Sequence, residues 1–162
     1  MGKTLVAYFS CSGVTEQLAK TLAPLVGGDL YKIEPAVPYT NADLNWRDSG
    51  SRSTIEMKDK NSRPAIEGKV NCMENYDTVF VGFPIWWYAA PTIINTFLES
   101  YDFSAKTVIP FATSGSSGMG DTDKRLHPSC SKETKWRASK RFPADVKVGS
   151  LQKWVEELKV RN

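Results

Sequence analysis

Apolar runs and amphipathic segments alternate along this chain. Nearly continuous apolar runs, rich in strand-forming residues, cover 3–9, 78–83 and 107–112. Between them, apolar residues recur at helical spacing over 14–26 and again after Pro91. Strands that are apolar throughout are buried on both faces, which is typical of a parallel sheet covered by helices. The pattern therefore predicts an α/β fold, and right-handed crossover connections leave few possible topologies.

The remaining segments complete this alternation. Gly27 and Gly28 end the first helix as a C-terminal cap would. A short strand at 30–33 precedes a long polar connection through Met57, in which we expect a helix. The other expected elements are a short helix over 121–130 interrupted by Pro128, a last strand over 134–142 and a closing amphipathic helix over 151–160. No repeat or low-complexity linker divides the chain, so we expect one domain over 1–162.

Composition narrows the class of protein. Hydrophobic residues make up 41% of the chain and charged residues 24%, close to the average of globular proteins. No apolar run approaches the roughly 20 residues of a membrane helix, and the first residues lack the pattern of a signal peptide. Cys11, Cys72 and Cys130 form neither a CxxC pair nor a zinc-binding pattern. We therefore expect a cytoplasmic protein without a metal site, a membrane span or a nucleic-acid partner.

Positive charge gathers toward the carboxyl end of the chain. The formal net charge is +3, and the residues from Asp121 onward hold eleven Lys and Arg against six Asp and Glu. Such an excess can attract an anionic nucleotide or protein, although a solvated basic face is its commoner meaning.

The loop after the first strand has the composition of a phosphate site. Ser10, Ser12 and Thr15 supply hydroxyls, and Gly13 and Val14 open the helix that follows. Unpaired backbone N–H groups and the positive end of the helix dipole favour an anion there, so no Lys or Arg is needed. The alternative is that Ser12 simply caps the helix. Neither GxGxxG nor the P-loop pattern occurs in the chain, which argues against a Rossmann dinucleotide site and against ATP hydrolysis.

An aromatic loop follows the run at 78–83. It contains Pro84, Ile85, Trp86, Trp87 and Tyr88, and a second proline closes it. Prolines reduce the entropy lost when a loop is fixed around a ligand, and aromatic rings offer a stacking surface. Three consecutive rings at a strand end cannot all face inward. We expect at least one to pack in the core and the others to offer a platform for a flat ring.

A third loop, after 107–112, is small and polar. Thr113, Ser114, Gly115 and Ser116 present short side chains and accessible amides, which suit the polar edge of a heterocycle but also suit a plain flexible turn. Parallel sheets bind ligands beyond the carboxyl ends of their strands. One ligand with a phosphate and a flat ring would account for all three loops.

Four segments together resemble the flavodoxin family. They are LVAYFSCSGVT, YDTVFVGFPIWWYAAP, FLESYDFSAKTVIPFATSGSSG and SLQKWVEEL, in the order and spacing of the family's bacterial branch. The resemblance implies a flavodoxin-like three-layer sandwich, with a five-stranded parallel sheet of order 2-1-3-4-5 and helices on both faces. It also implies noncovalently bound FMN, which performs the redox chemistry without a catalytic acid or base from the protein.

The resemblance further assigns roles to the three loops. It places the FMN phosphate at Ser10, Ser12, Gly13, Val14 and Thr15. It places the ribityl chain and ring near 84–88 and the pyrimidine edge beside 113–116. Val14 stands where many family members carry Asn. The implied function is electron transfer with redox partner proteins or an NAD(P)H-linked reductase.

Other functions stay open at this point. An FMN-dependent NAD(P)H quinone or azo reductase uses the same fold and loops. A low-molecular-weight phosphatase also carries a cysteine in its first loop, but Gln17 stands five residues after Cys11, where that enzyme needs an arginine. We expect His127, the only histidine, at the surface rather than as a base. Tyr39 and Trp46, in the long connection, either cover the ring or pack locally.

Overall fold

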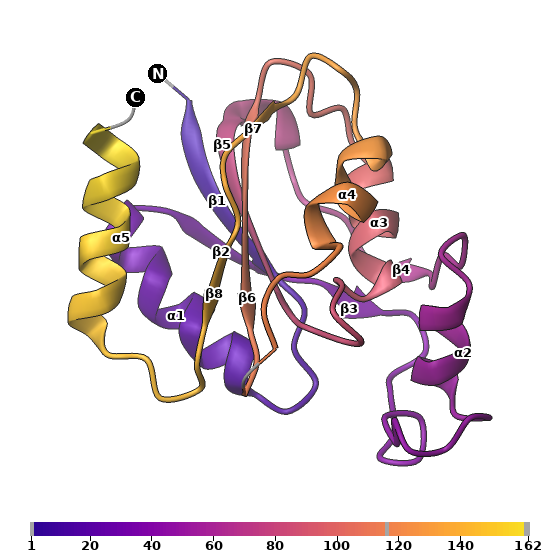
Figure 1. Cartoon of the computed structure of the whole chain (residues 1–162). Coiled ribbons are helices and arrows are strands. Elements are labelled where there is room, and N and C mark those ends of the chain that lie inside the picture. The colour runs from indigo at the N-terminus through magenta and orange to yellow at the C-terminus, as the bar shows by residue number, and fades with distance from the viewer. Residues whose placement is uncertain (1, 116, 161–162) are drawn as a thin grey trace.

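A computed structural model describes residues 2–115 and 117–160 and has the layered α/β architecture predicted from the sequence (Figure 1). The elements, in chain order, are β1 (Lys3–Tyr8), α1 (Val14–Val26), β2 (Asp29–Lys32), β3 (Glu34–Pro35), α2 (Arg52–Lys58), β4 (Ile66–Glu67), η1 (Met73–Asn75), β5 (Tyr76–Pro84), α3 (Thr92–Glu99), β6 (Thr107–Thr113), α4 (Thr122–Leu126), η2 (His127–Ser129), β7 (Lys135–Trp136), β8 (Lys140–Phe142) and α5 (Val148–Val160).

The main sheet has the strand order implied by the resemblance. Its order is β2-β1-β5-β6-β7, β8 also pairs with β6, and every pair is parallel. With β7 and β8 counted as the fifth strand, this is the arrangement 2-1-3-4-5. Figure 1 shows α1 and α5 on one face of the sheet and α3 and α4 on the other. The predicted fold class is confirmed.

The strands separate two hydrophobic cores. Along β1, Leu5 and Ala7 belong to the core beneath α3, whereas Val6 and Tyr8 belong to the core beneath α1 and α5. This alternation follows from the two-residue period of a strand. Because both faces are covered, the three apolar runs are buried from Leu5, Val79 and Val108 onward, and the carboxyl end of each run leads into a loop at one edge of the sheet.

The predicted last strand is interrupted in the structure. It forms β7 and β8, which pair with opposite ends of β6. The backbone N–H of Arg137 donates to the Val108 carbonyl at 3.0 Å. Pro110, two residues further along β6, turns its backbone to the same side but has no N–H to donate. The ladder between β6 and the fifth strand is therefore broken in its middle.

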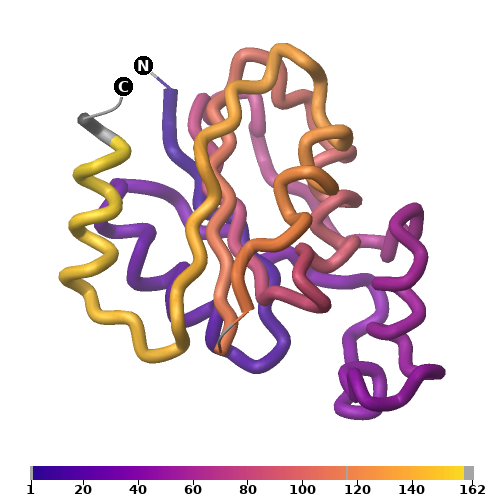
Figure 2. The backbone as a smooth tube through the Cα atoms, viewed as in Figure 1, coloured from indigo at the N-terminus to yellow at the C-terminus, as the bar shows by residue number. Residues whose placement is uncertain are grey.

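The long connection forms an arm, residues 36–65, which carries α2 and which we call the α2 arm. Two short antiparallel strands, β3 and β4, close its base. In Figure 2 the arm stands out from the sandwich. The Arg52 guanidinium holds it together, because it lies 3.7 Å from the centre of the Tyr39 ring and donates to the Val37 carbonyl at 2.7 Å. The pairing of β3 with β4 was not predicted, because two-residue strands have no readable periodicity.

Gly82 of β5 is paired with Phe111 of β6, whose ring is buried against it. A Cβ at this position would lie 2.2 Å from the Phe111 Cζ atom, so Gly82→Ala must displace core side chains. We expect it to lower the free energy of unfolding by about 1–3 kcal/mol, measured by urea denaturation. Gly149→Ala, which would meet open space in α5, is the matched control and should be neutral or slightly stabilising. Equal midpoints for Gly82→Ala and the unchanged protein would contradict this packing.

Among the described residues, no helix combines the length and apolar character needed to cross a membrane.

Candidate ligand-binding site

The predicted loops border one cleft at the carboxyl edge of the sheet. Its volume is about 680 Å³. The walls come from the first loop, the aromatic loop, the third loop and the α2 arm. The lining residues are Cys11, Ser12, Leu44, Trp46, Ser53, Pro84, Ile85, Trp86, Trp87, Tyr88 and Ser117. None of these side chains carries a formal charge at neutral pH, so the cleft suits a ligand held by backbone dipoles, hydroxyls and apolar contact.

The first loop presents the start of α1. Gly13 is the residue before the helix and has φ of +92°, a conformation that glycine adopts without strain. Its N–H donates to the Ser10 hydroxyl at 3.1 Å, and among the residues that the structure describes no side chain caps the helix. The first intrahelical bond runs from the Gln17 N–H to the Gly13 carbonyl, which leaves the N–H groups of 14–16 outside the helical ladder. The structure thus does not use Ser12 as the cap, and both Ser12 and Gly13 are exposed.

Two predicted residues tie the loops together instead of lining the cleft. The hydroxyls of Thr15 and Thr113 form a buried hydrogen bond of 2.8 Å between the first and third loops. Val14 and Thr113 line a separate, smaller hollow of about 240 Å³ beside α5. The Thr15–Thr113 hydrogen bond therefore positions the first and third loops relative to each other.

The aromatic loop is a tight turn with an unusual backbone. Trp86 and Ala89 exchange hydrogen bonds of 2.9 and 3.1 Å, and Trp87 and Tyr88 between them have φ of +47° and +61°. Bulky residues rarely adopt positive φ, and each such residue costs about 1–3 kcal/mol. The turn exposes 42% of Trp87 and 62% of Tyr88. It therefore holds two large rings at the surface in a conformation that glycine or asparagine would adopt more easily.

Trp86 also lines the cleft, but it is partly buried and packs against the core. Its ring lies 5.8 Å from that of Phe9 and 5.6 Å from that of Tyr39, centre to centre, in edge-to-face geometry. This confirms the expectation that one ring of the three packs inward while others remain exposed.

Gly120, which was not predicted to matter for the site, lies against the backbone of the aromatic turn. The N–H of Asp121 donates to the Tyr88 carbonyl at 2.8 Å, and a Cβ on Gly120 would lie 2.3 Å from that same oxygen. Gly120 has φ of +53°. The segment before α4 therefore sits directly against the backbone of Tyr88 and leaves the turn little room to move.

The third loop is held by Arg141 of β8. The Arg141 guanidinium donates to the Ser114 hydroxyl at 2.9 Å and to the Ser114 and Gly115 carbonyls at 2.9 and 2.7 Å. The Ser114 hydroxyl in turn donates to the Ser117 carbonyl. The Ser114 hydroxyl is thus already engaged within the protein. Ser116, also predicted at the site, lies outside the described residues.

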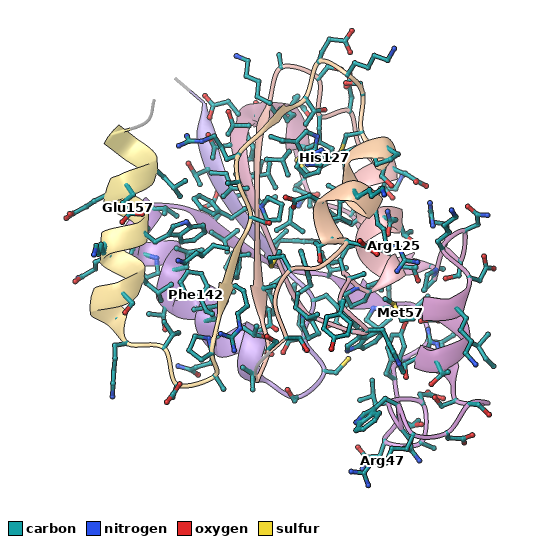
Figure 3. The ribbon with its side chains drawn as sticks, in the orientation of Figure 1. Arg47, Met57, Arg125, His127, Phe142 and Glu157 are labelled. Carbon is teal, nitrogen blue, oxygen red and sulfur yellow. The ribbon has the colours of Figure 1, made fainter. Side chains whose placement is uncertain are left out.

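The structure distinguishes the roles of Tyr39 and Trp46. Tyr39 packs locally, and its hydroxyl donates to Glu56; burial, followed by this bond, raises the pKa of Tyr39 far above its usual range. Trp46 is 62% exposed and lines the cleft, with the Arg47 guanidinium 5.0 Å from its ring centre. Figure 3 shows Arg47 at the outer end of the α2 arm. Trp46 is therefore the aromatic ring that the arm contributes to the cleft.

Cys11 lies in the first loop as a thiol rather than a thiolate. Desolvation by the surrounding loop raises its pKa to about 11. In a Cys72→Ala/Cys130→Ala background, we expect alkylation of Cys11 by iodoacetamide to be slow at pH 7–8 and to reach half of its maximum rate at about pH 11, because only the thiolate reacts. The rate-against-pH curve measures the pKa, and a plateau below pH 9 would contradict the assignment. Gln17 also stands where a low-molecular-weight phosphatase needs its arginine, so Cys11 does not suit the nucleophile of such an enzyme.

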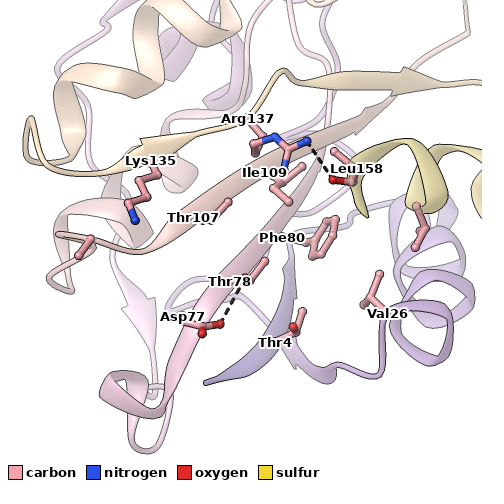
Figure 4. A pocket seen from close by; sticks show the side chains of 12 residues that line it. Thr4, Val26, Asp77, Thr78, Phe80, Thr107, Ile109, Lys135, Arg137 and Leu158 are labelled. Carbon is pink, nitrogen blue, oxygen red and sulfur yellow. Dashed lines mark hydrogen bonds between the residues drawn. The ribbon is translucent and has the colours of Figure 1, made fainter. Parts of the chain in front are cut away.

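His127 and a further hollow lie away from this cleft. His127 is exposed and stacks on Trp136 with ring centres 4.3 Å apart, which confirms its predicted surface position (Figure 3). The hollow in Figure 4, of about 360 Å³, is lined by Thr4, Thr78 and Thr107 at the amino ends of their strands. It therefore lies at the opposite edge of the sheet from the three loops.

Solved structures of known proteins are similar to this chain over nearly its whole length. No curated protein matches the chain. Two solved structures of proteins provisionally called flavoproteins are similar. One, from Bacteroides uniformis, is 48% identical, with 96% of this chain and 98% of that chain covered and a TM-score of 0.90. The other, from Bacteroides eggerthii, is 44% identical, with 97% and 98% covered and a TM-score of 0.88.

A more distant structure shares the fold. The flavoprotein of Lactobacillus acidophilus, solved in complex with FMN, is 20% identical over 96% of this chain and 99% of that chain, with a TM-score of 0.72. The family model described as flavodoxin matches residues 3–158, nearly the whole chain. The protein therefore belongs to the flavodoxin family.

Proposed function

We propose that this chain is a single FMN-binding domain, 1–162, that carries electrons. One observation carries the proposal: an uncharged cleft joins the uncapped start of α1 to a wall of exposed aromatic rings. A helix amino terminus binds phosphate, and exposed rings bind a flat heterocycle. Membership of the flavodoxin family and the FMN complex of the Lactobacillus protein support FMN as the cofactor.

The residues present fit this cofactor. The Ser12 hydroxyl and the N–H groups at the start of α1 would hold the phosphate, and Trp46, Trp87 and Tyr88 would border the ring. With the ring bound, these side chains would cover it from water and set its surroundings. When bound, FMN supplies the redox chemistry, and no acid or base in the lining is required for it. We further propose that the protein acts in the cytoplasm with a redox partner protein or an NAD(P)H-linked reductase.

A basic cleft supports a second candidate, an FMN-dependent NAD(P)H reductase. This cleft, of about 630 Å³, is lined by Lys60, Lys124 and Arg125 among other residues. Within 2–115 and 117–160, none of these three cations forms an ion pair. Asp121 also lines it, and its backbone N–H donates to the carbonyl of Tyr88 in the turn. The phosphates of a nicotinamide nucleotide could therefore bind close to the proposed ring site.

Electron-transfer assays distinguish the two candidates. As a carrier, the FMN-loaded protein should relay electrons from an added NAD(P)H-linked reductase to cytochrome c, while alone it oxidises NAD(P)H only slowly. Rapid NADPH oxidation by the protein alone, with a quinone as acceptor, would contradict the carrier. In that case Arg125→Glu should raise the KM for NADPH, whereas Lys153→Glu on α5 should not.

A further inference from the structure

Ser53 places a buried hydroxyl without a partner in the wall of the cleft. The residue lies in the first turn of α2 and is only 2% exposed. Its Oγ is one of two buried side-chain polar atoms with no hydrogen-bond partner in the part of the chain that the structure describes. Ser53 also lines the cleft. Buried polar groups are nearly always hydrogen-bonded in native proteins, so an orphan at the wall of a cleft indicates a partner that arrives with a ligand.

Neighbouring hydroxyls in the same helical turn are engaged. Ser51 precedes α2, its hydroxyl accepts from the Thr54 N–H at 3.4 Å, and it donates to the Thr54 hydroxyl at 2.9 Å. Ser51 and Thr54 therefore cap the helix. The Ser53 N–H donates to the Asp43 carbonyl at 2.9 Å, which fixes the residue against the segment that carries Leu44 and Trp46. The backbone of Ser53 is thus held by the arm, while its hydroxyl takes no part in the cap.

The surroundings of Ser53 suit a ring rather than a phosphate. Its neighbours in the arm, Leu44 and Trp46, offer apolar and aromatic surface, and the wall at 84–88 is also largely aromatic. The helix terminus suited to a phosphate belongs to the first loop, a different segment of the lining. A hydroxyl in an apolar wall fixes the orientation in which a flat molecule binds, because only a polar atom at the edge of the molecule can form a hydrogen bond with it.

We propose that the Ser53 hydroxyl is a specificity contact of this cleft and forms a hydrogen bond with a polar atom at the edge of the flavin ring. This inference rests on the proposed FMN site and adds a contact from the α2 arm that none of the three sheet-edge loops provides. In the protein without FMN the hydroxyl remains buried and unsatisfied, which reduces stability. The same group thus favours the ligand and disfavours the empty fold.

Ser53→Ala tests the proposal through two quantities expected to change in opposite directions. Fluorescence titration should show FMN and riboflavin weakened by the same factor, about 3–10-fold, the usual worth of one hydrogen bond. Thermal unfolding of the FMN-free variant should shift upward by about 2–4 °C, because the unsatisfied hydroxyl is gone. Ser51→Ala is the matched control: it removes the cap, so the unfolding temperature should fall. Ser53→Cys, of similar size but a weak hydrogen-bond donor, should weaken both ligands as well.

The outcomes separate this inference from the proposed function. If the unchanged protein binds neither FMN nor riboflavin, the proposed function itself fails. If it binds both and Ser53→Ala binds them equally well, the ring contact is wrong while the FMN site stands. Weakening of FMN alone would place Ser53 at the phosphate and would also overturn the inference. A fall in unfolding temperature like that of Ser51→Ala would show a structural hydroxyl instead.

Discussion

Replacing Ser12 by glutamate is expected to weaken FMN binding by about a hundredfold or more while riboflavin binding changes little. The exposed Ser12 side chain lines the cleft beside the uncapped start of α1. Two like charges about 4 Å apart repel by roughly 4 kcal/mol near a protein surface, and 1.4 kcal/mol corresponds to about tenfold in affinity. Riboflavin lacks the phosphate and escapes this repulsion. Parallel fluorescence titrations with the two ligands measure the effect.

A matched variant separates this effect from a general change in charge. Gln17→Glu adds the same charge to α1 one turn later, at an exposed residue outside the cleft lining. It should reduce FMN affinity far less than Ser12→Glu does. Equal losses for FMN and riboflavin in Ser12→Glu would mean that the first loop does not hold the phosphate.

Replacing the two residues of the aromatic turn together, Trp87→Asn with Tyr88→Gly, should give a more stable protein that binds flavin less well. Asn-Gly is the preferred pair where both central residues of a two-residue turn have positive φ. Because Trp87 and Tyr88 hold that conformation at a cost, we expect the free energy of unfolding to rise by about 1–3 kcal/mol in urea. Loss of the stacking rings should weaken FMN and riboflavin alike, by about 10- to 100-fold.

Conservative changes at the same turn provide the control. Trp87→Phe with Tyr88→Phe keeps two rings and the costly backbone, so both stability and flavin affinity should stay near those of the unchanged protein. If the Asn-Gly variant kept full affinity for both ligands, the exposed rings would have no part in binding. If it were less stable, the turn would not be strained.

The strands and helices that depend on the local spacing of apolar residues could be predicted from the sequence. The apolar runs at 3–9, 78–83 and 107–112 became the buried parts of β1, β5 and β6, because burial on both faces leaves no polar positions in a strand. The helix at 14–26 and its glycine end were correct in the same way. The strand order came from the resemblance to the flavodoxin family, since periodicity does not specify which strands are neighbours.

Features that depend on contacts distant in the sequence were missed. Arg141 holds the third loop from 27 positions away, and a lone arginine in a strand gives no sign of this. Gly120 matters only because the Tyr88 backbone lies against it. The break at Pro110 could have been foreseen from its missing N–H, but only once its neighbouring strand was known. Ser53 looks like any other serine until its burial and lack of a partner are seen.

A titration of the FMN-free protein with FMN and, separately, with riboflavin, measured by quenching of flavin fluorescence, tests whether the start of α1 holds the phosphate of a bound flavin. We expect saturation at one FMN per chain and an affinity for FMN about tenfold or more above that for riboflavin, because the start of α1 binds the phosphate. Equal affinities for the two ligands would mean that the first loop does not bind the phosphate, and no saturation by FMN at millimolar concentration would mean that the protein has no FMN site.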